Sequence, residues 1–408
     1  KKKPNKTGGG IKMIQKTIRL YLAFSFAIKL GISFISAIYA MFLISRGLDL
    51  FEVSLVNFSF FTVLFIMEIP TGVFADSFGR KLSFILSCFL IGIGMFVYGQ
   101  AHALGGFILA EVICAVGHTF LSGAFQAWFV DTLKYHGYTG TLDRVFSQEQ
   151  SVANCAGILG AIAGAFLADW GSALPWIAGG GIWMMTGIAA IFLIKEEYFV
   201  HRRFSVNDCF APLKRLPRLA RNFGIRNSAV RFILLMGGFQ IIVVQAPNMQ
   251  WQPFFQPFLG SKTSFGFLFA AIYVSLLVGS YLAPRFLKIC GSEKRALLAS
   301  QIVIGIGMMI SAAVGIFSFA LAMFLVHEVM RGLFRPIKDA YLNDHIPSQE
   351  RATLISLEAT ILHFGGMIGL LATGFAAQQT SIATTWIISA LFLIIVTLCI
   401  ARMKTDHA

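Results

Sequence analysis

The sequence contains little charge. Of 408 residues, 13% are Asp, Glu, Lys or Arg. Soluble domains typically carry ~25%. Hydrophobic residues make up 57%, so the chain has too few polar side chains to cover a water-facing globule. This deficit excludes a soluble enzyme, a disordered tail protein and a collagen-like chain, and it predicts an all-α integral membrane protein.

Motifs for metal binding and catalysis are also missing. The six cysteines show no CxxC spacing, so neither a zinc site nor a disulfide framework is indicated. The sequence contains no GxSxG, HExxH or P-loop motif. We therefore expect no enzymatic activity, no cofactor and no metal.

Apolar segments of about 20 residues recur along the whole chain, the length that a helix needs to cross a bilayer. The first apolar run, from about 18 to 44, is longer than the ~7–15-residue core of a signal peptide and is expected to remain as a spanning helix. The first six predicted helices are 19–44, 51–75, 82–98, 105–130, 146–168 and 174–194. The second six are 232–246, 265–283, 296–316, 319–342, 352–377 and 383–403.

Cations lie mainly on one side of these predicted helices. With the N-terminus inside, the inner segments hold 27 Lys and Arg, the outer segments hold two, and four lie within helices. Cytoplasmic loops carry such an excess, so the net charge of +14 reports topology and not nucleic-acid binding. We expect a multi-pass protein of the cytoplasmic membrane with both termini in the cytoplasm.

The chain divides near its middle. Residues 195–231 form a basic linker with nine Lys or Arg, between predicted six-helix bundles at 1–194 and 232–408. An internal repeat supports this division: QAWFVDTL at 126–133 matches DAYLNDHI at 339–346, and AGILGAIAGAFLA at 156–168 matches GGMIGLLATGFAA at 365–377. Twelve helices in two pseudo-symmetric six-helix bundles are therefore expected.

One loop motif carries a family resemblance. GVFADSFGRK at 72–81, between the second and third predicted helices, resembles the loop signature of the major facilitator superfamily. The helix count, the repeat and the central linker extend the resemblance over the whole chain. It implies a secondary transporter that works by alternating access, with this loop holding the cytoplasmic ends together. The predicted gate residues are Gly72, Asp76, Gly79, Arg80, Lys81 and Asp131.

Physical chemistry gives these gate residues separate tasks. Gly72 allows close helix approach, Gly79 suits a tight turn, and Asp76 and Asp131 offer two anions to Arg80. The alternative is that Arg80 and Lys81 are only anchors on the positive side. The corresponding loop of the second half has Pro284 where Asp76 would align, so that loop has only a degenerate form of the gate motif.

The segments at 68–76 and 331–356 look like bacterial drug or metabolite exporters of this family. Helix 5 has glycines without the proline of the antiporter signature, and helix 4 has Glu111 and His118 but no Arg. The direction of transport and the coupling ion therefore remain open.

Ionisable groups inside a membrane are costly and are candidates for function. The resemblance implies that helices 1, 4, 7 and 10 line a central cavity. The predicted substrate and proton site is Lys29, Glu111, His118, Gln126, Gln240, Glu328, Arg331 and Arg335. We expect Glu68 and Glu358 to make helix–helix or gate contacts instead.

Glu328, Arg331 and Arg335 share one helical face because they are three and four residues apart. In one interpretation Glu328 and Arg331 only neutralise each other. In the other, Arg331 binds an anionic group of the substrate, while Glu328 or Glu111 takes the coupling proton; Lys29 then pairs with Glu111 or contacts substrate.

The function expected from these residues is proton-linked export of a small anionic or zwitterionic metabolite, such as a siderophore or a carboxylate, by a monomer. The alternatives are efflux of lipophilic cations, import of a metabolite, and a receptor or lipid-handling protein on the same fold. The predicted partners are the solute, protons and the lipid bilayer.

Overall fold

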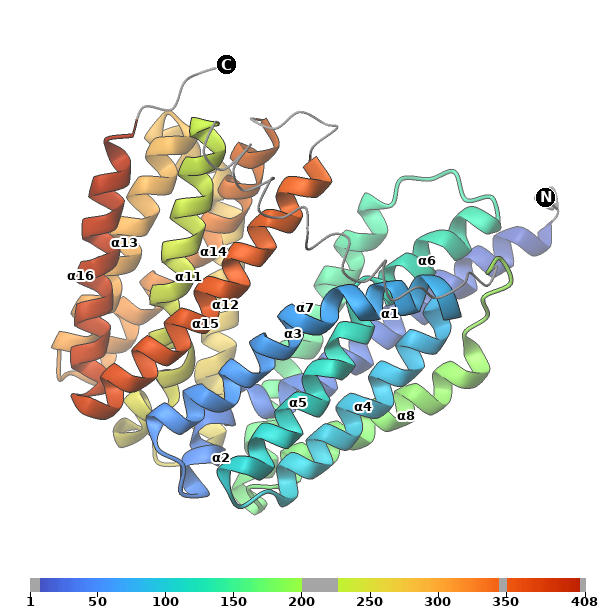
Figure 1. Ribbon diagram of the computed structural model, residues 1–408, viewed down its shortest axis with the longest axis horizontal. Coiled ribbons are helices and arrows are strands. Elements are labelled where there is room, and N and C mark those ends of the chain that lie inside the picture. The colour runs from blue at the N-terminus through green and yellow to red at the C-terminus, as the bar shows by residue number, and fades with distance from the viewer. Residues whose placement is uncertain (1–7, 200–226, 345–350, 404–408) are drawn as a thin grey trace. The chain divides into compact units, whose positions relative to one another are not determined.

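The computed structural model describes residues 8–199, 227–344 and 351–403 (Figure 1). The regular elements in these ranges are helices. Those before the linker are α1 (Gly8–Ser36), α2 (Tyr39–Ser45), α3 (Leu50–Phe78), α4 (Arg80–Gln100), α5 (Leu104–Leu121), α6 (Ala124–Tyr135), α7 (Asp143–Trp170) and α8 (Leu174–Leu193). Those after it are α11 (Ser228–Phe255), the 3₁₀ turn η3 (Gln256–Phe258), α12 (Lys262–Cys290), α13 (Glu293–Ala313), α14 (Phe317–Asp344), α15 (Arg351–Gln379) and α16 (Ile382–Ala401).

Within the described ranges, twelve helical segments are long and apolar enough to span a membrane. The predicted all-α fold with twelve transmembrane helices is confirmed. Most of the predicted basic linker, residues 200–226, lies outside the described residues.

Three predicted helix boundaries were wrong. The first predicted helix is two helices, because α1 ends at Ser36 and α2 begins at Tyr39. The fourth is interrupted between α5 and α6, where Gly123 has a φ of 71°, a backbone conformation that glycine adopts without strain. The seventh continues nine residues beyond its expected end at residue 246, just before Pro247, since neighbouring groups can satisfy a spanning helix around a proline.

The first compact unit comprises Lys1–Tyr39, Thr62–Pro212 and Ser261–Phe269. Its main packing pairs are α1 with α7 and α8, and α4 with α5 and α8. Glycines let the helix backbones approach closely, as where Gly164 meets the backbone of Phe34. Stacked rings fill the interior, including Tyr98 on Trp176 with centroids 4.0 Å apart.

The second compact unit comprises Ala40–Phe61, Leu213–Gly260 and Ala270–Ala408. Helix α13 packs against α14 and α16, and α11 packs against α15 and α16 (Figure 1). Gly279 meets the backbone of Val329, and Gly332 meets that of Leu276. Trp386 supplies the aromatic core, stacked on Phe254 at 4.5 Å.

The two halves repeat individual contacts as well as helices. Gly94 approaches Cys114 on the next helix, and Gly307 approaches His327 in the same way. Cys114 Sγ donates to the carbonyl of Ile91 at 3.9 Å, and His327 Nδ1 lies 3.0 Å from the carbonyl of Ile304. Equivalent residues lie 213 positions apart, as Asp131 and Asp344 do in the sequence repeat. The pairs are Gly94 and Gly307, Cys114 and His327, and Ile91 and Ile304. The pseudo-symmetry therefore extends to single side chains.

Repeated contacts also tie the helix ends together. Lys81 donates to the carbonyl of Ile191 at 2.8 Å, and Lys294 donates to that of Met403 at 2.6 Å. In each half, the lysine near the start of the third spanning helix thus meets the end of the sixth, where unpaired carbonyls favour a cation.

The fifth spanning helix of each half caps a helix of the other predicted half. Asp169 at the end of α7 accepts hydrogen bonds from the backbone of Lys262 and Thr263 at the start of α12, at 2.8 and 3.0 Å. Gln378 at the end of α15 accepts one from the backbone of Leu50, the first residue of α3, at 3.3 Å. Asp169 and Gln378 are equivalent in the repeat alignment, 209 residues apart.

Candidate functional site

The gate motif forms a one-residue turn between α3 and α4. Gly79 has a φ of 107°, which explains why glycine stands there. A side chain at this position would also collide with the carboxylate of Glu196. The close helix approach predicted at Gly72 was wrong for the part of the chain that the structure describes, since no atom lies within 4 Å of where its Cβ would be.

Arg80 forms an ion pair with Asp131 on α6. Asp76 lies farther away, with Oδ1 4.0 Å from Arg80 Nη2, and its side chain is 65% exposed. The side chains of Arg80 and Asp131 are 25% and 33% exposed. Asp131 is therefore the main partner of Arg80, and Asp76 remains accessible from solvent.

Glu196 is a motif partner that sequence reasoning missed. Its two carboxylate oxygens accept hydrogen bonds from the backbone N–H groups of Arg80 and Lys81, each at 3.0 Å. An anion is favourable at this place because the first N–H groups of a helix lack intrahelical partners. The available signal was the acidic pair Glu196 and Glu197 at the start of an otherwise basic linker.

The segment that carries Glu196 is anchored to α6. Trp128 Nε1 donates to the carbonyl of Lys195 at 3.0 Å, and the Tyr198 hydroxyl donates to the carbonyl of Trp128 at 3.4 Å. Burial, together with the charge of Glu196, raises the pKa of Tyr198 to about 12, so the hydroxyl keeps its proton at neutral pH. The loop motif and the end of the sixth helix thus form one cluster.

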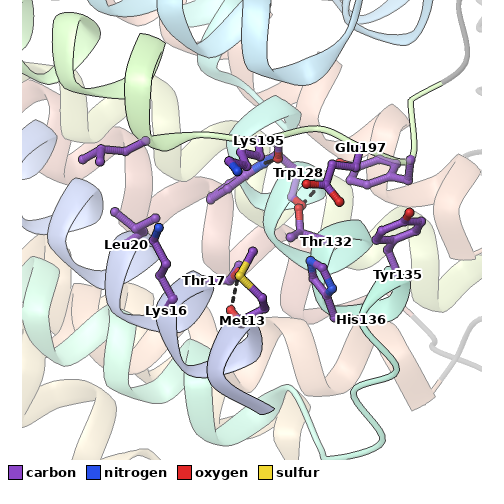
Figure 2. Close-up of a pocket in the computed structure, with 12 residues that line it drawn as sticks. Met13, Lys16, Thr17, Leu20, Trp128, Thr132, Tyr135, His136, Lys195 and Glu197 are labelled. Atoms are coloured by element: carbon purple, nitrogen blue, oxygen red, sulfur yellow. Dashed lines mark hydrogen bonds between the residues drawn. The ribbon is translucent and has the colours of Figure 1, made fainter. Parts of the chain in front are cut away.

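Figure 2 shows a small pocket beside this cluster, where Lys195 and Glu197 lie near Trp128 and Thr132. Its volume is about 20 Å³, room for roughly one water molecule. It is too small for an organic solute.

In the first unit, the candidates on the first and fourth predicted helices lie in different surroundings. Glu111 is 7% exposed and hydrogen bonds with Tyr98 in the aromatic core. His118 Nδ1 lies 3.1 Å from the carbonyl of Cys114, Lys29 is half-buried, and Gln126 is exposed.

The repeat explains the place of Glu111. The residue 213 positions later is Phe324, which stacks on Trp386 in the core of the second unit. Glu111 therefore occupies a core-facing position. His118 is the counterpart of Arg331.

The second unit contains a cavity of about 710 Å³. Small-molecule sites usually measure ~300–1,000 Å³, so a small organic solute fits. The cavity is lined by residues of α11, α12, α14 and α15. Gln240, Arg331 and Arg335 from the predicted site are among them.

Arg331 and Glu328 form the pair that their spacing predicts. Arg331 Nη1 donates to both Glu328 oxygens, at 2.8 and 3.1 Å. Glu328 is buried, with 2% of its side chain exposed, while Arg331 is 21% exposed. His327 Nε2 lies 3.7 Å from Glu328 Oε1. The carboxylate is thus held behind Arg331, which presents its charge at the cavity wall.

A second charged cluster lies farther along the same wall. Lys338 contacts Glu358 on α15 and lies 2.9 Å from Asp339. Arg335 is 86% exposed and lies 3.8 Å from Asp339. Sequence reasoning placed Glu358 in a helix–helix contact but left Lys338 and Asp339 out of the site. The signal was their spacing, since Lys338 continues the face of Arg331 and Arg335.

The comparisons with known proteins agree with this architecture. A family model described as Major Facilitator Superfamily matches residues 232–407. YxaM of Bacillus subtilis, an uncharacterized MFS-type transporter, is 24% identical over 383 residues, covering 92% of this chain and 93% of YxaM. MJ1560 of Methanocaldococcus jannaschii, also an uncharacterized MFS-type transporter, is 21% identical and covers 94% of this chain and 97% of its own length.

Among solved structures, the nucleoside transporter NupG matches with a TM-score of 0.73 at 14% identity, covering 96% of this chain and all of that one. The twelve spanning helices in two repeated halves agree with this fold. Taken with the relatives that span nearly its whole length, the family match supports a membrane transporter of the major facilitator type.

Proposed function

We propose that this transporter moves a small organic solute that bears a negative group, by alternating access, and that Arg331 binds that group. The observation that carries the proposal is the cavity of about 710 Å³ in the second unit, with the Arg331 side chain in its wall. A guanidinium suits a carboxylate or phosphate because its planar donors match two oxygens at once.

The arrangement of Glu328 supports this role. It contacts Arg331 through one nitrogen, Nη1. A guanidinium carries five N–H donors on three nitrogens, so donors on the other nitrogens are available to a substrate without loss of the Glu328 contact. Arg335 and Gln240 line the same cavity and extend the polar wall. Among the residues of the first half, we propose that Glu111 has a structural role, because it is buried and hydrogen bonds with Tyr98.

The gate and the topology complete the proposal. We place the motif of Asp76, Arg80, Lys81 and Asp131 on the cytoplasmic side, where it stabilises one closed state. Both termini then lie in the cytoplasm, as the 27 inner and two outer cations predict. Transport is proton-linked. The exporter-like segments favour export and the charges of the cavity, argued below, favour uptake, a choice that the lumen pH measured during transport decides.

A pair of Arg331 variants tests the substrate class. Thermal stabilisation of the purified protein is screened against organic anions, zwitterions and lipophilic cations, because a ligand of the native state raises its stability. We expect anions to stabilise the native protein and Arg331→Gln to remove the effect, a loss of about 1.5–3 kcal/mol for a hydrogen bond to a charged group. Arg331→Lys keeps the positive charge but loses the planar pair of donors, so it should retain part of the stabilisation by anions.

The competing function is efflux of lipophilic cations, in which carboxylates bind the drug. If Arg331→Gln binds and transports normally while Glu328→Gln abolishes efflux of a cation such as tetraphenylphosphonium, the anionic-substrate proposal fails.

A further inference from the structure

Lys338 is a buried cation held by two carboxylates at the cavity wall. Its side chain is 9% exposed and that of Glu358 is 10% exposed. The pair connects α14 with α15, while Asp339, 48% exposed, contacts Lys338 from the same helix. All three residues line the cavity of the second unit.

Packing does not require a lysine at this position. The repeat counterpart of Lys338, 213 residues earlier, is Phe125, which stacks on Phe84 with centroids 4.4 Å apart. The first half thus fills the equivalent place with a buried aromatic ring. A buried ion pair is costly to desolvate and is often replaceable by apolar groups without loss of stability. The presence of Lys338 and Glu358 therefore points to a functional role.

The charges of the described cavity wall cancel when Glu328, buried directly behind Arg331, is included. Three cations contact three carboxylates: Arg331 with Glu328, Lys338 with Glu358, and Arg335 with Asp339. The residue of α14 that contacts Glu358 is Lys338. The other charged residues of α14 that line the cavity are Asp339, Arg335 and Arg331. From α11 and α12 the described lining is Gln240 and apolar residues. An anion that enters this neutral cluster leaves it with excess negative charge, which uptake of one proton removes.

We propose that Glu358 takes up this proton when Lys338 passes from Glu358 to the anionic group of the substrate, so that proton and anion are transported together. The proton comes from bulk water and resides on the Glu358 carboxyl. Glu358 is the acceptor because it is the more buried of the two carboxylates that contact Lys338, and because Glu328 keeps its hydrogen bonds to Arg331. This inference rests on the proposed anionic substrate.

The sense of the coupling follows from linkage. Binding of the anion strengthens binding of the proton and the reverse by the same factor, typically about 5–150-fold. Export by exchange with protons requires the two to compete. The charge balance of this cavity therefore predicts symport, the opposite of the antiport that the expected export would need.

Proteoliposomes test the proposal. The full chain is reconstituted into vesicles that contain the pH dye pyranine in weak buffer, with the membrane potential clamped by potassium and valinomycin. The probes are labelled succinate, citrate and glutamate, which cross lipid poorly. We expect anion uptake with acidification of the lumen, and uptake that weakens as the external pH rises from 6 to 8.

Four variants separate the roles of the residues. Glu358→Gln resembles the protonated state, so it should take up the anion without acidification and with less than about twofold change from pH 6 to 8. Glu358→Asp keeps a carboxyl and should keep acidification, which guards against a variant that merely misfolds. Glu149→Gln on α7, which does not line the cavity, is the matched control and should also acidify. Lys338→Met should weaken uptake at least tenfold.

Alkalinisation of the lumen, or acidification that persists in Glu358→Gln, overturns the inference. Anion uptake by the native chain without any pH change also overturns it while leaving the proposed substrate class intact. If the three anions are not transported and tetraphenylphosphonium is, the proposed function fails and the inference falls with it.

Discussion

At the scale of single residues, the loop motif depends on contacts that its own spacing does not contain. The sequence predicted the contact of Arg80 with Asp131, but Glu196 lies 116 residues after Arg80. Its carboxylate caps α4, and Gly79 leaves room for it. Motif reasoning finds residues within a loop, whereas a cap from a distant segment depends on tertiary packing.

The two anions near Arg80 should respond differently to substitution. Asp131→Asn removes the ion pair between α4 and α6, and should lower stability by about 0.5–1 kcal/mol for a partly exposed pair. Asp76→Asn should leave the melting temperature unchanged, because Asp76 is 65% exposed, yet slow transport if Asp76 acts in the gate. Thermal melting and proteoliposome uptake of the two variants provide the measurement.

Transport at the native rate by Asp76→Asn would remove Asp76 from the gate. An equal loss of melting temperature in both variants would instead show that Asp76 is a structural partner of Arg80.

At the scale of helices, hydropathy predicted the number and type of the elements but not their interruptions. A twenty-residue apolar window contains no signal for the break after Ser36, since no glycine or proline stands between Phe34 and Tyr39. Pro247 led to the opposite error. The rule that proline ends a helix predicted an end there, but the helix continues because neighbouring groups satisfy its backbone. Helix number depends on composition, whereas breaks depend on packing.

The caps at the starts of α3 and α12 offer a test at this scale. Asp169 accepts two backbone hydrogen bonds and one at 2.6 Å from the Thr263 hydroxyl, whereas Gln378 accepts one backbone hydrogen bond. Asp169→Ala should cost about 1 kcal/mol, the usual value of a cap, and so speed amide exchange at 262–266 roughly fivefold. Gln378→Ala should have a smaller effect on 50–53. Hydrogen–deuterium exchange measures both.

Ser381→Ala is the matched control, because Ser381 caps α16 through Thr384 and should leave α12 unchanged. Unaltered exchange at 262–266 in Asp169→Ala would show that other contacts hold the start of α12.

At the scale of the whole molecule, the repeat separates scaffold from site. Positions that keep equivalent contacts in both halves, such as Gly94 with Gly307 and Lys81 with Lys294, maintain the fold. Charge stands where the halves differ, with Lys338 opposite Phe125. The sequence identified Arg331 and Glu328 from their spacing on one helix. It could not identify the cluster of Lys338, which requires the register of α14 against α15.

The orientation of the chain in the membrane is the remaining test. The loop at 101–103 joins α4 to α5, and the loop at 136–142 joins α6 to α7. The excess of inner cations places the first loop outside and the second inside. In a variant without native cysteines, His102→Cys should react with an impermeant maleimide in right-side-out vesicles, and Thr139→Cys should react only after the membrane is permeabilised. Both positions are exposed in the structure, so access to the reagent depends on the side of the membrane. Labelling in the reverse order would invert the topology and move the gate motif to the outer surface.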